Sequence, residues 1–313
     1  MSEMRGRNEK IERLLAEVKK AIKGKDDVIV SVITAMLAGG HILLEDIPGV
    51  GKTTLAVALS GAFSLNYRRV QFTPDVLPSD LVGFNMYNNK TGQFEYREGC
   101  VYCNFLLADE INRTSPKTQS ALLEVMEEGR ATVDGVTRML PNPFIVLATQ
   151  NPFGSAGTQK LPESQLDRFI ICRSLGYPDH RAAVDILTGN AGRRPEISPV
   201  LSVEEFLEAK ERVKQVHVDD EIVDFIVRFC ENTREHNLVS LGVSPRGTIA
   251  LFDMAKAAAY VAGRDFVIPD DVFRNISAVC AHRLVLSPRA KAMKLTTDDV
   301  LAEVLKNTEL PKM

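Results

Sequence analysis

The first half of the chain contains five short apolar segments in which hydrophobic and polar residues do not alternate. Segments with helical periodicity lie between them. This arrangement is typical of parallel strands that are covered by helices on both faces of a sheet. The pattern therefore predicts a three-layer α/β domain. Its predicted strands are residues 41–45, 69–72, 104–109, 144–149 and 169–172.

Helix signals fill the gaps between these strands. A mixed-charge amphipathic pattern covers residues 1–25, and a helical pattern covers residues 52–63. Ser115 and Pro116 are a typical N-cap and first-turn pair for a helix that Gly129 would end. After residue 178 only helical patterns remain, so we expect a domain at 1–178 and an all-helical domain at 179–313. The second set of predicted helices is residues 180–189, 203–216, 220–235, 245–262 and 269–286.

Two hairpins are predicted to interrupt the α/β domain. Asp134-Gly135 stands between Thr-Val and Val-Thr, which predicts a tight hairpin near residues 131–140. A second hairpin with a longer loop, residues 88–92, is predicted near residues 84–96. Both could also be surface elements without a function.

Composition limits the class of protein. Of the 313 residues 45% are hydrophobic and 25% are charged, and the formal net charge is −3. These values are typical of a soluble globular protein of about two domains, and they give no strong attraction to nucleic acid or acidic lipid. The N-terminal helix lacks a signal-type apolar core, and no run of about 18 apolar residues occurs. We therefore expect a cytoplasmic protein without direct membrane insertion.

The five cysteines and five histidines do not form an evident site. Cys100 and Cys103 have the spacing of metal ligands, but no second pair or nearby histidine completes four ligands. We interpret the cysteines as reduced structural thiols. His41 and His282 are interpreted as structural rather than catalytic residues.

A glycine-rich turn follows the first predicted strand and precedes a helix, as Gly49-Val50-Gly51-Lys52-Thr53. Such a turn points several backbone N–H groups into one small volume, and the helix N-terminus adds partial positive charge. Phosphate suits this position. Lys52 would reach the β- and γ-phosphates, and the hydroxyl of Thr53 would bind Mg²⁺. Asp46 stands where the usual motif has its first glycine; Asp tolerates unusual backbone angles, so we interpret the loop as functional.

Asp109 and Glu110 end the third predicted strand. We expect Asp109 to reach the Mg²⁺ shell and Glu110 to polarise the attacking water. The alternative is an acidic pair that only ends a strand. Asn151 follows the fourth strand, where it would bind the γ-phosphate or the water, or form an Asx turn before Pro152. Arg168 precedes the last strand and has the planar, permanently charged side chain that suits a transition-state phosphoryl group.

These motifs resemble the MoxR branch of the AAA+ ATPases over nearly the whole chain. The resemblance rests on Pro-Gly-x-Gly-Lys-Thr at 48–53, Asp-Glu-Ile-Asn-Arg at 109–113, Ala-Thr-Gln-Asn-Pro at 148–152, Leu-Pro-Glu-x-Gln-Leu-Asp-Arg-Phe at 161–169 and Ser-Pro-Arg at 244–246. It implies an AAA+ P-loop three-layer sandwich with a parallel sheet of strand order 5-1-4-3-2, a helical lid, and a ring, usually a hexamer, that binds ATP with Mg²⁺ between subunits.

The resemblance also implies roles for single residues. Glu110 would be the base, Asn151 the first sensor, Arg168 the finger that reaches a neighbouring subunit, and Arg246 the second sensor on the lid. Arg113 would face the adjacent subunit or make a helix-end contact. Thr53 and Asp109 would bind the metal. The nucleotide-binding residues would be Pro48, Gly49, Val50, Gly51, Lys52, Thr53 and Thr54.

The two hairpins match the family's helix-2 insert and pre-sensor-1 hairpin, which implies client contacts at residues 86–94 and 134–138. Relatives bind a partner with a von Willebrand factor A domain and remodel or activate protein complexes. A chaperone-like ATPase ring is therefore the leading hypothesis. The alternatives are a DNA-translocating or metal-chelatase-type motor subunit, and a nucleotide-gated binding scaffold with little turnover.

Overall fold

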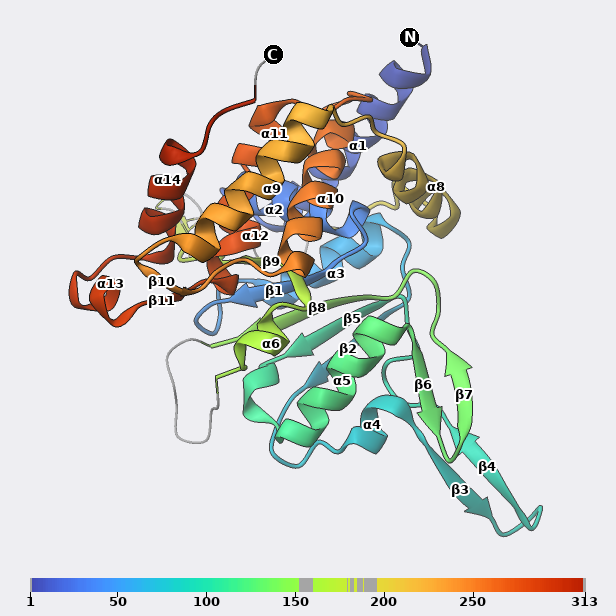
Figure 1. Ribbon diagram of the computed structural model, residues 1–313. Helices are drawn as coiled ribbons and strands as arrows, with labels where there is room; N and C mark the ends of the chain where they lie inside the picture. Colours follow the sequence, from blue (N-terminus) through green and yellow to red (C-terminus); the bar gives the residue numbers. More distant parts are fainter. Residues whose placement is uncertain are drawn as a thin grey trace.

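The computed structural model describes residues 2–151, 160–178, 180, 183–184, 188 and 196–311. The predicted helix at 180–189 lies mostly outside these residues. Figure 1 shows a sheet with helices on both faces, an upper helical region, and two hairpins that project from the lower end of the molecule. Among the described helices, none is long and apolar enough to cross a membrane.

The central sheet has five parallel strands in the order β2-β5-β8-β1-β9. Numbered along the chain as strands 1 to 5, this is the predicted order 5-1-4-3-2. The strands are β1 His41–Glu45, β2 Tyr67–Gln71, β5 Phe105–Asp109, β8 Ile145–Gln150 and β9 Phe169–Arg173. All five lie within two residues of the predicted apolar segments. Strands β1, β5, β8 and β9 are mostly buried and therefore mostly apolar, whereas β2 is an edge strand with partly exposed residues.

Successive strand residues supply the two faces of the sheet. Ile42 and Leu44 belong to one hydrophobic cluster, and Leu43 between them belongs to the other. This alternation is the two-residue period of a β-strand. The first cluster contains buried residues of α1 Ser2–Ala21, α2 Asp26–Leu37 and α3 Lys52–Ala62, and the second contains those of α5 Pro116–Glu128.

Helix α5 begins and ends as its sequence predicts. The hydroxyl of Ser115 accepts a hydrogen bond from the backbone N–H of Thr118 at 3.3 Å, and Pro116 occupies the first turn. Gly129 follows with φ 61°, a left-handed conformation that glycine adopts without the steric cost of a Cβ. These two signals fix the length of α5, and so they fix where its last turn meets the edge of the sheet.

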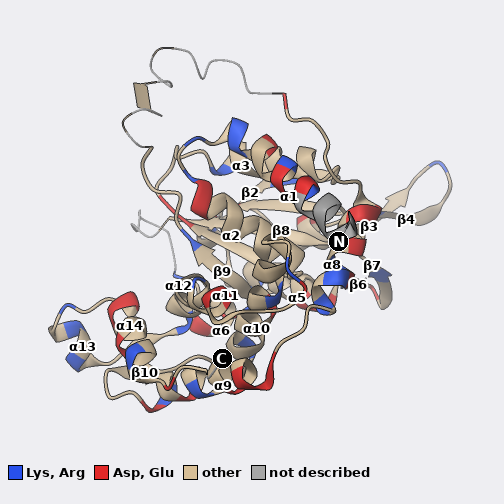
Figure 2. Cartoon of the chain, turned by 90° about the horizontal axis from the view of Figure 1, so that it is seen from above, with Lys and Arg blue, Asp and Glu red and all other residues tan. Residues whose placement is uncertain are grey.

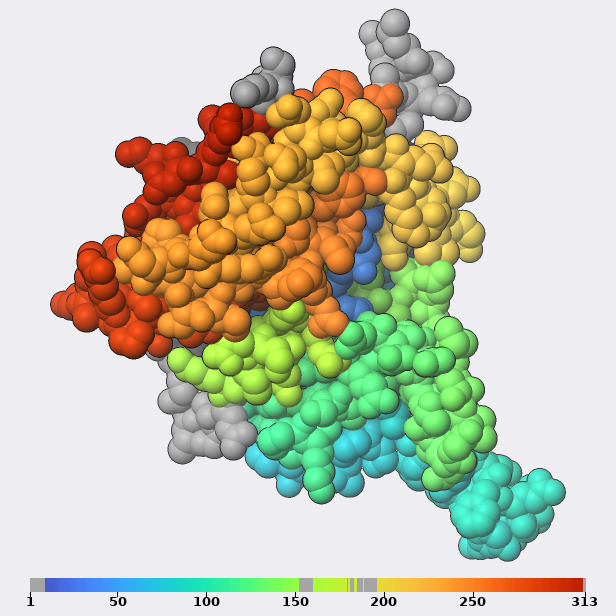
Figure 3. Space-filling model, in the orientation of Figure 1, coloured from blue at the N-terminus to red at the C-terminus, as the bar shows by residue number. Residues whose placement is uncertain are grey.

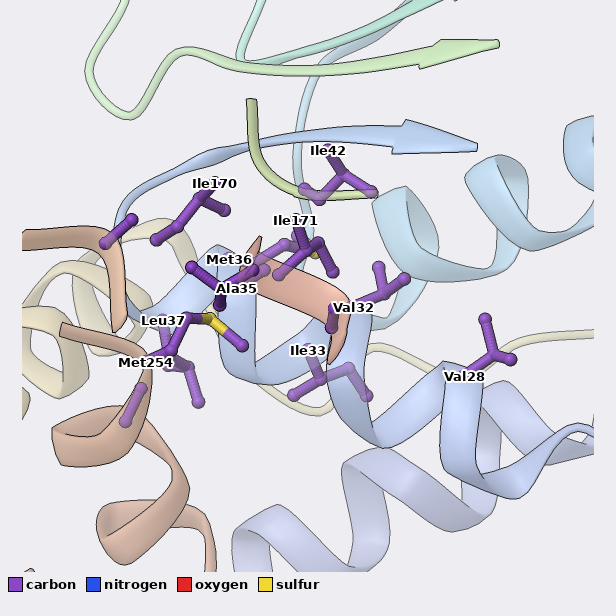
Figure 4. Close-up of a cluster of buried hydrophobic side chains, with 14 of the residues drawn as sticks. Val28, Val32, Ile33, Ala35, Met36, Leu37, Ile42, Ile170, Ile171 and Met254 are labelled. Atoms are coloured by element: carbon purple, nitrogen blue, oxygen red, sulfur yellow. The ribbon is translucent and has the colours of Figure 1, made fainter. Parts of the chain in front are cut away.

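The helical region packs on the sheet through helix α2. Figure 4 shows side chains of α2, including Ile33 and Met36, between Ile42 and Ile171 of the sheet and Met254 of the lid helix α10. One hydrophobic cluster runs from Ile11 to Val304. The described long helices of this region are α8 Val203–Lys214, α9 Asp220–Glu235, α10 Pro245–Val261 and α14 Thr297–Asn307.

The prediction of one helix over 269–286 is wrong. The segment forms α11 Pro269–Phe273, α12 Ile276–Cys280, the 3₁₀ turn η2 Ala281–Arg283 and the strand β11 Val285–Leu286. Strand β11 pairs with β10 Val239–Leu241, so this region is not purely helical. Tertiary contacts overrode the local pattern, because the buried guanidinium of Arg283 donates to carbonyls of strand β9.

Both predicted hairpins are present. Strands β3 Phe84–Asn88 and β4 Gln93–Arg97 form one, and β6 Arg130–Val133 and β7 Val136–Met139 form the other. They touch where Asn85 donates to Asp134 at 2.6 Å. Figure 3 shows the β3–β4 hairpin as a separate projection at the lower right. Its exposed residues include Met86, Tyr87 and Phe94, and the neighbouring hairpin exposes Val136 and Met139.

Both ring nitrogens of His41 contact the backbone, as expected of a structural histidine. Its Nε2 lies 2.9 Å from the carbonyl oxygen of Met126, and its Nδ1 accepts from the backbone N–H of Val146 at 3.0 Å. Burial lowers the pKa of His41 to about 4, because desolvation disfavours the charged ring. His282 is likewise buried and bonded to the carbonyl of Phe169. The five cysteines are free thiols.

Candidate functional site

The glycine-rich loop that is predicted to bind phosphate joins strand β1 to helix α3. Gly49 and Gly51 have φ 87° and 102°, values that residues with a Cβ rarely adopt. A Cβ added at Gly49 would meet no atom within 4 Å, so the space over this glycine is open. Gly51 is the N-cap of α3, and no side chain caps this helix. The first N–H groups of α3 therefore remain available to an anion.

Lys52 lies inside the loop and is 8% exposed. Its ammonium donates to the carbonyl oxygens of Asp46 at 2.9 Å and Ile47 at 3.2 Å. Burial lowers the pKa of Lys52, and the carboxylates of Asp46, Asp109 and Glu110 act in the opposite direction. Strand β8 lies between the parallel strands β1 and β5, so the loop after β1 and the acidic pair at the end of β5 lie at the same edge of the sheet.

Asp46 has a different role from the one expected of a tolerant loop residue. It is 4% exposed and is absent from the described residues with positive φ, so no unusual backbone angle requires it. Its carboxylate accepts from the hydroxyl of Ser174 at 2.7 Å and from the backbone N–H groups of Leu175 at 2.6 Å and Gly176 at 2.9 Å. Asp46 therefore ties the start of the loop to the chain that leaves β9.

Replacing Asp46 with Gly, the residue of the usual motif, is expected to lower the free energy of unfolding by about 2–4 kcal/mol, since the buried N–H of Leu175 and the half-buried N–H of Gly176 lose their acceptor. Urea denaturation of the variant and wild type measures the difference. Asp75→Gly, at an exposed position, is the control for glycine's own entropic cost. If both glycine variants have the same free energy of unfolding, the hydrogen bonds of Asp46 do not contribute to stability.

Asp109 ends strand β5 with both carboxylate oxygens engaged. The Thr149 hydroxyl donates to Oδ1 at 2.6 Å, and the Arg69 guanidinium donates to Oδ2 at 2.7 Å. Thr149 lies on β8 and Arg69 on β2, the two strands that flank β5. These contacts hold the carboxylate at the carboxyl edge of the sheet, beside the loop that follows β1.

Glu110 leaves the strand in a left-handed conformation, with φ 58° and ψ 48°. This conformation costs a residue with a Cβ about 1–2 kcal/mol. Its N–H donates to the hydroxyl of Thr149 at 2.8 Å, which compensates part of that cost. The carboxylate of Glu110 pairs with Arg113 at 2.7 Å. For Arg113 the sequence left open either a contact to an adjacent subunit or a contact at a helix end. Within this chain Arg113 makes the second kind, at the end of the turn η1 Ile111–Arg113.

Asn151 follows β8, which lies between β1 and β5. Its position is thus beyond the carboxyl edge, between the phosphate-binding loop and Asp109. The side-chain N–H of Asn112 donates to the carbonyl oxygen of Asn151 at 3.2 Å, which links this residue to the turn after Glu110. The structure therefore brings Lys52, Asp109, Glu110 and Asn151 to one edge of the sheet.

The residues at this edge fit a magnesium nucleotide. The uncapped helix and the two glycines suit phosphate oxygens, and Lys52 supplies a buried positive charge. No group of three or more His, Cys, Asp or Glu residues that could hold a metal occurs in the described part of the chain. Mg²⁺ commonly binds through one or two protein ligands together with substrate phosphates. Thr53 and Asp109 would supply those protein ligands here.

Arg168 and Arg246 lie at the other edge of the sheet. Arg168 directly precedes β9, so it stands at the amino edge of a parallel sheet whose carboxyl edge carries the loop. Strands of this length span about 16 Å. Arg168 is bound to Glu127 of α5 at 2.7 Å, and Arg246, at the start of α10, pairs with the second oxygen of the same carboxylate. Neither arginine joins Lys52 and Glu110 in this chain.

The contacts around Asp167 hold the lid against this edge. Its carboxylate accepts from the Ser244 hydroxyl, which caps α10, at 2.8 Å, and from Nε of Arg283 at 2.8 Å. The Arg283 side chain is 2% exposed. Arg168, Arg246 and Arg283 line a cavity of about 170 Å³. Figure 2 shows both basic and acidic residues on the helices α9 and α14 of the same region.

Sequence reasoning did not identify several of these polar residues. Thr149 could have been found as a polar residue inside an otherwise apolar strand that ends in Gln-Asn. Arg69 carries a similar signal, since it lies within the predicted second strand. Glu127 and Arg283 carry no such signal, because each is one charged residue among others in a helical pattern.

Comparison with known proteins gives two family matches. Residues 41–171 match the ATPase family associated with various cellular activities (AAA), and residues 231–304 match the AAA lid domain. A solved structure of a protein from Cytophaga hutchinsonii that is proposed to be an ATPase superposes with a TM-score of 0.92 at 34% identity. The match covers 99% of this chain and 98% of that one.

Curated relatives match over nearly the whole chain. The uncharacterised protein YeaC of Bacillus subtilis is 45% identical, with 96% of this chain and 94% of that protein covered. The chaperone MoxR1 of Mycobacterium tuberculosis is 39% identical, with 97% and 83% covered. The protein MoxR of Methylorubrum extorquens is 29% identical, with 88% of each chain covered.

Proposed function

This chain belongs to the MoxR family of AAA+ ATPases, and we propose on that premise that it assembles into an ATP-hydrolysing ring that remodels or activates protein complexes. The ring is expected to be a hexamer and to act in the cytoplasm. Its partner is expected to be a protein with a von Willebrand factor A domain or another client protein, with no direct contact to nucleic acid or lipid.

One observation carries this proposal. Lys52, Asp109 and Glu110 stand at the carboxyl edge of the sheet, whereas Arg168 and Arg246 stand at its amino edge. The two groups cannot meet across about 16 Å of paired strand within one chain. They can meet if the amino edge of one copy faces the carboxyl edge of the next. A head-to-tail contact of this kind gives a ring when the rotation between neighbouring copies closes.

Each group then has a part in hydrolysis. The loop residues from Pro48 to Thr54 hold the phosphates, and bound Mg²⁺ would neutralise charge on the phosphate oxygens. Glu110 polarises the attacking water, while Asn151 orients the water or the γ-phosphate. Arg168 and Arg246 come from the neighbouring copy and compensate the charge that spreads over the transferred phosphoryl group.

The two hairpins are the proposed contact to the client. They project from the same end of the folded molecule (Figure 1), and a hydrogen bond from Asn85 to Asp134 links them. Phe94 and Met139 are each 72% exposed, an unusual exposure for side chains of this size. Exposed aromatic and methionine side chains suit a polypeptide partner, because such residues are enriched at protein interfaces.

The ring predicts that ATPase activity depends on protein concentration. Specific activity of the wild-type chain should rise as subunits assemble, since a lone subunit lacks the arginines of a neighbour. Turnover measured over a dilution series, with the assembly state followed by analytical ultracentrifugation, checks this expectation. A specific activity that stays constant while rings dissociate would exclude a shared site.

A further inference from the structure

The carboxylate of Glu127 holds both proposed trans-acting arginines at once. Its Oε2 lies 2.7 Å from Nη1 of Arg168, and its Oε1 accepts from Nη2 of Arg246. The three residues come from three separate parts of the chain: helix α5, the start of β9 and the start of the lid helix α10. One carboxylate thus sets the spacing between a residue of the sheet and a residue of the lid.

The two arginines depend on Glu127 to different degrees. Arg168 has a second contact, because its Nη1 also donates to the carbonyl of Leu123 at 2.7 Å. Among the described contacts, Arg246 has Glu127 as its hydrogen-bond and ion-pair partner. An arginine side chain without a partner samples many rotamers, and two guanidinium groups without a counter-charge repel each other.

We propose that Glu127 is a positioning residue that holds Arg168 and Arg246 as a pair for the nucleotide of the neighbouring subunit. This inference rests on the proposed function. Both guanidinium groups keep further N–H donors beyond those bound to Glu127, and they border the cavity of about 170 Å³. A phosphate can therefore bind the pair while Glu127 remains in place.

Comparison of Glu127→Ala with Glu128→Gln tests the proposal. Glu128 is the next residue of α5 and makes an exposed ion pair with Arg130, so it controls for loss of charge at this end of the helix. Glu127→Ala should lower kcat by about ten- to a hundredfold through misplacement of the arginines. Its KM for ATP should stay within about twofold, because the loop of the neighbouring copy binds the nucleotide.

A double-mutant cycle separates positioning from a structural effect. In an Arg246→Ala background, Glu127→Ala should cost less than it does in the wild type, because one of the two arginines it positions is already gone and Arg168 keeps its contact to Leu123. Ring assembly and thermal unfolding should stay near wild type, since the Glu127 side chain is 42% exposed. An additive loss in the cycle, or a rise in kcat for Glu127→Ala, would overturn the proposal.

The outcomes also separate this inference from the proposed function. Glu127→Ala turnover equal to that of Glu128→Gln, with Arg168→Ala inactive, overturns the role of Glu127 alone. If Arg168→Ala itself keeps wild-type turnover, the shared site is wrong and the role of Glu127 falls with it.

Discussion

Arg168→Ala is expected to lower ATP turnover by about 10³- to 10⁵-fold, the range over which arginine fingers act. In the proposed ring the guanidinium is the charge that meets the phosphoryl group of the adjacent copy, and alanine supplies none. ATP affinity should change little, because the glycine-rich loop and Lys52 of the neighbouring copy are expected to supply most of the nucleotide contacts. Steady-state kinetics and equilibrium binding of ATP measure the two quantities separately.

Subunit mixing gives the sharpest control for Arg168. A Lys52→Ala subunit lacks its own nucleotide contact but keeps its arginines, and an Arg168→Ala subunit has the reverse defect. Mixed rings should regain activity at interfaces where the intact halves meet. Arg274→Ala, at the exposed C-cap of α11, should behave as wild type. Mixed rings that stay inactive although both variants assemble would contradict a shared site.

Glu110→Gln is expected to lower turnover by about 10²- to 10⁴-fold and to keep ATP binding. The amide has nearly the shape of the carboxylate but cannot accept a proton from water. The residues that hold the phosphates, from Pro48 to Thr54, are unchanged. Single-turnover hydrolysis and nucleotide binding check both parts, with the exposed Glu208→Gln as a control variant.

The same variant traps the client. A ring that holds ATP without hydrolysing it should retain its partner, so affinity capture from the host with and without ATP identifies it. ATP-dependent enrichment of a von Willebrand A-domain protein supports the remodelling proposal. Capture of replication or chelatase components in its place would favour the motor alternatives. If Glu110→Gln hydrolyses ATP at the wild-type rate, another group must be the base.

Much of the fold could be predicted because its signals are local. The core strands are continuous apolar segments, and Ser115 and Gly129 mark the ends of α5 through the chemistry of one residue each. The positions of the glycine-rich loop between a strand and a helix and of Asp109 at the end of a strand were also predictable, since both depend on local sequence. Strand order came from the family resemblance and was confirmed.

The remainder depends on contacts between distant residues. From the sequence, Asp46 is only a variant loop residue. Its role depends on Ser174, 128 positions away, whose hydroxyl donates to it. Helical periodicity over 269–286 gave no sign that Arg283 would bind carbonyls of β9 and end the helix. The link between Glu127 and Arg246 spans 119 positions. Such long-range partners leave no periodic trace in the sequence.

Strand β9 has a consequence for how a ring would transmit force. It begins directly after Arg168, and the chain leaving it is fastened to the loop residue Asp46. In the proposed ring this strand, which pairs with β1, would span the distance of about 16 Å between two successive nucleotides. Movement of one subunit's glycine-rich loop and movement of the arginines proposed to face its neighbour would then be mechanically linked through five residues.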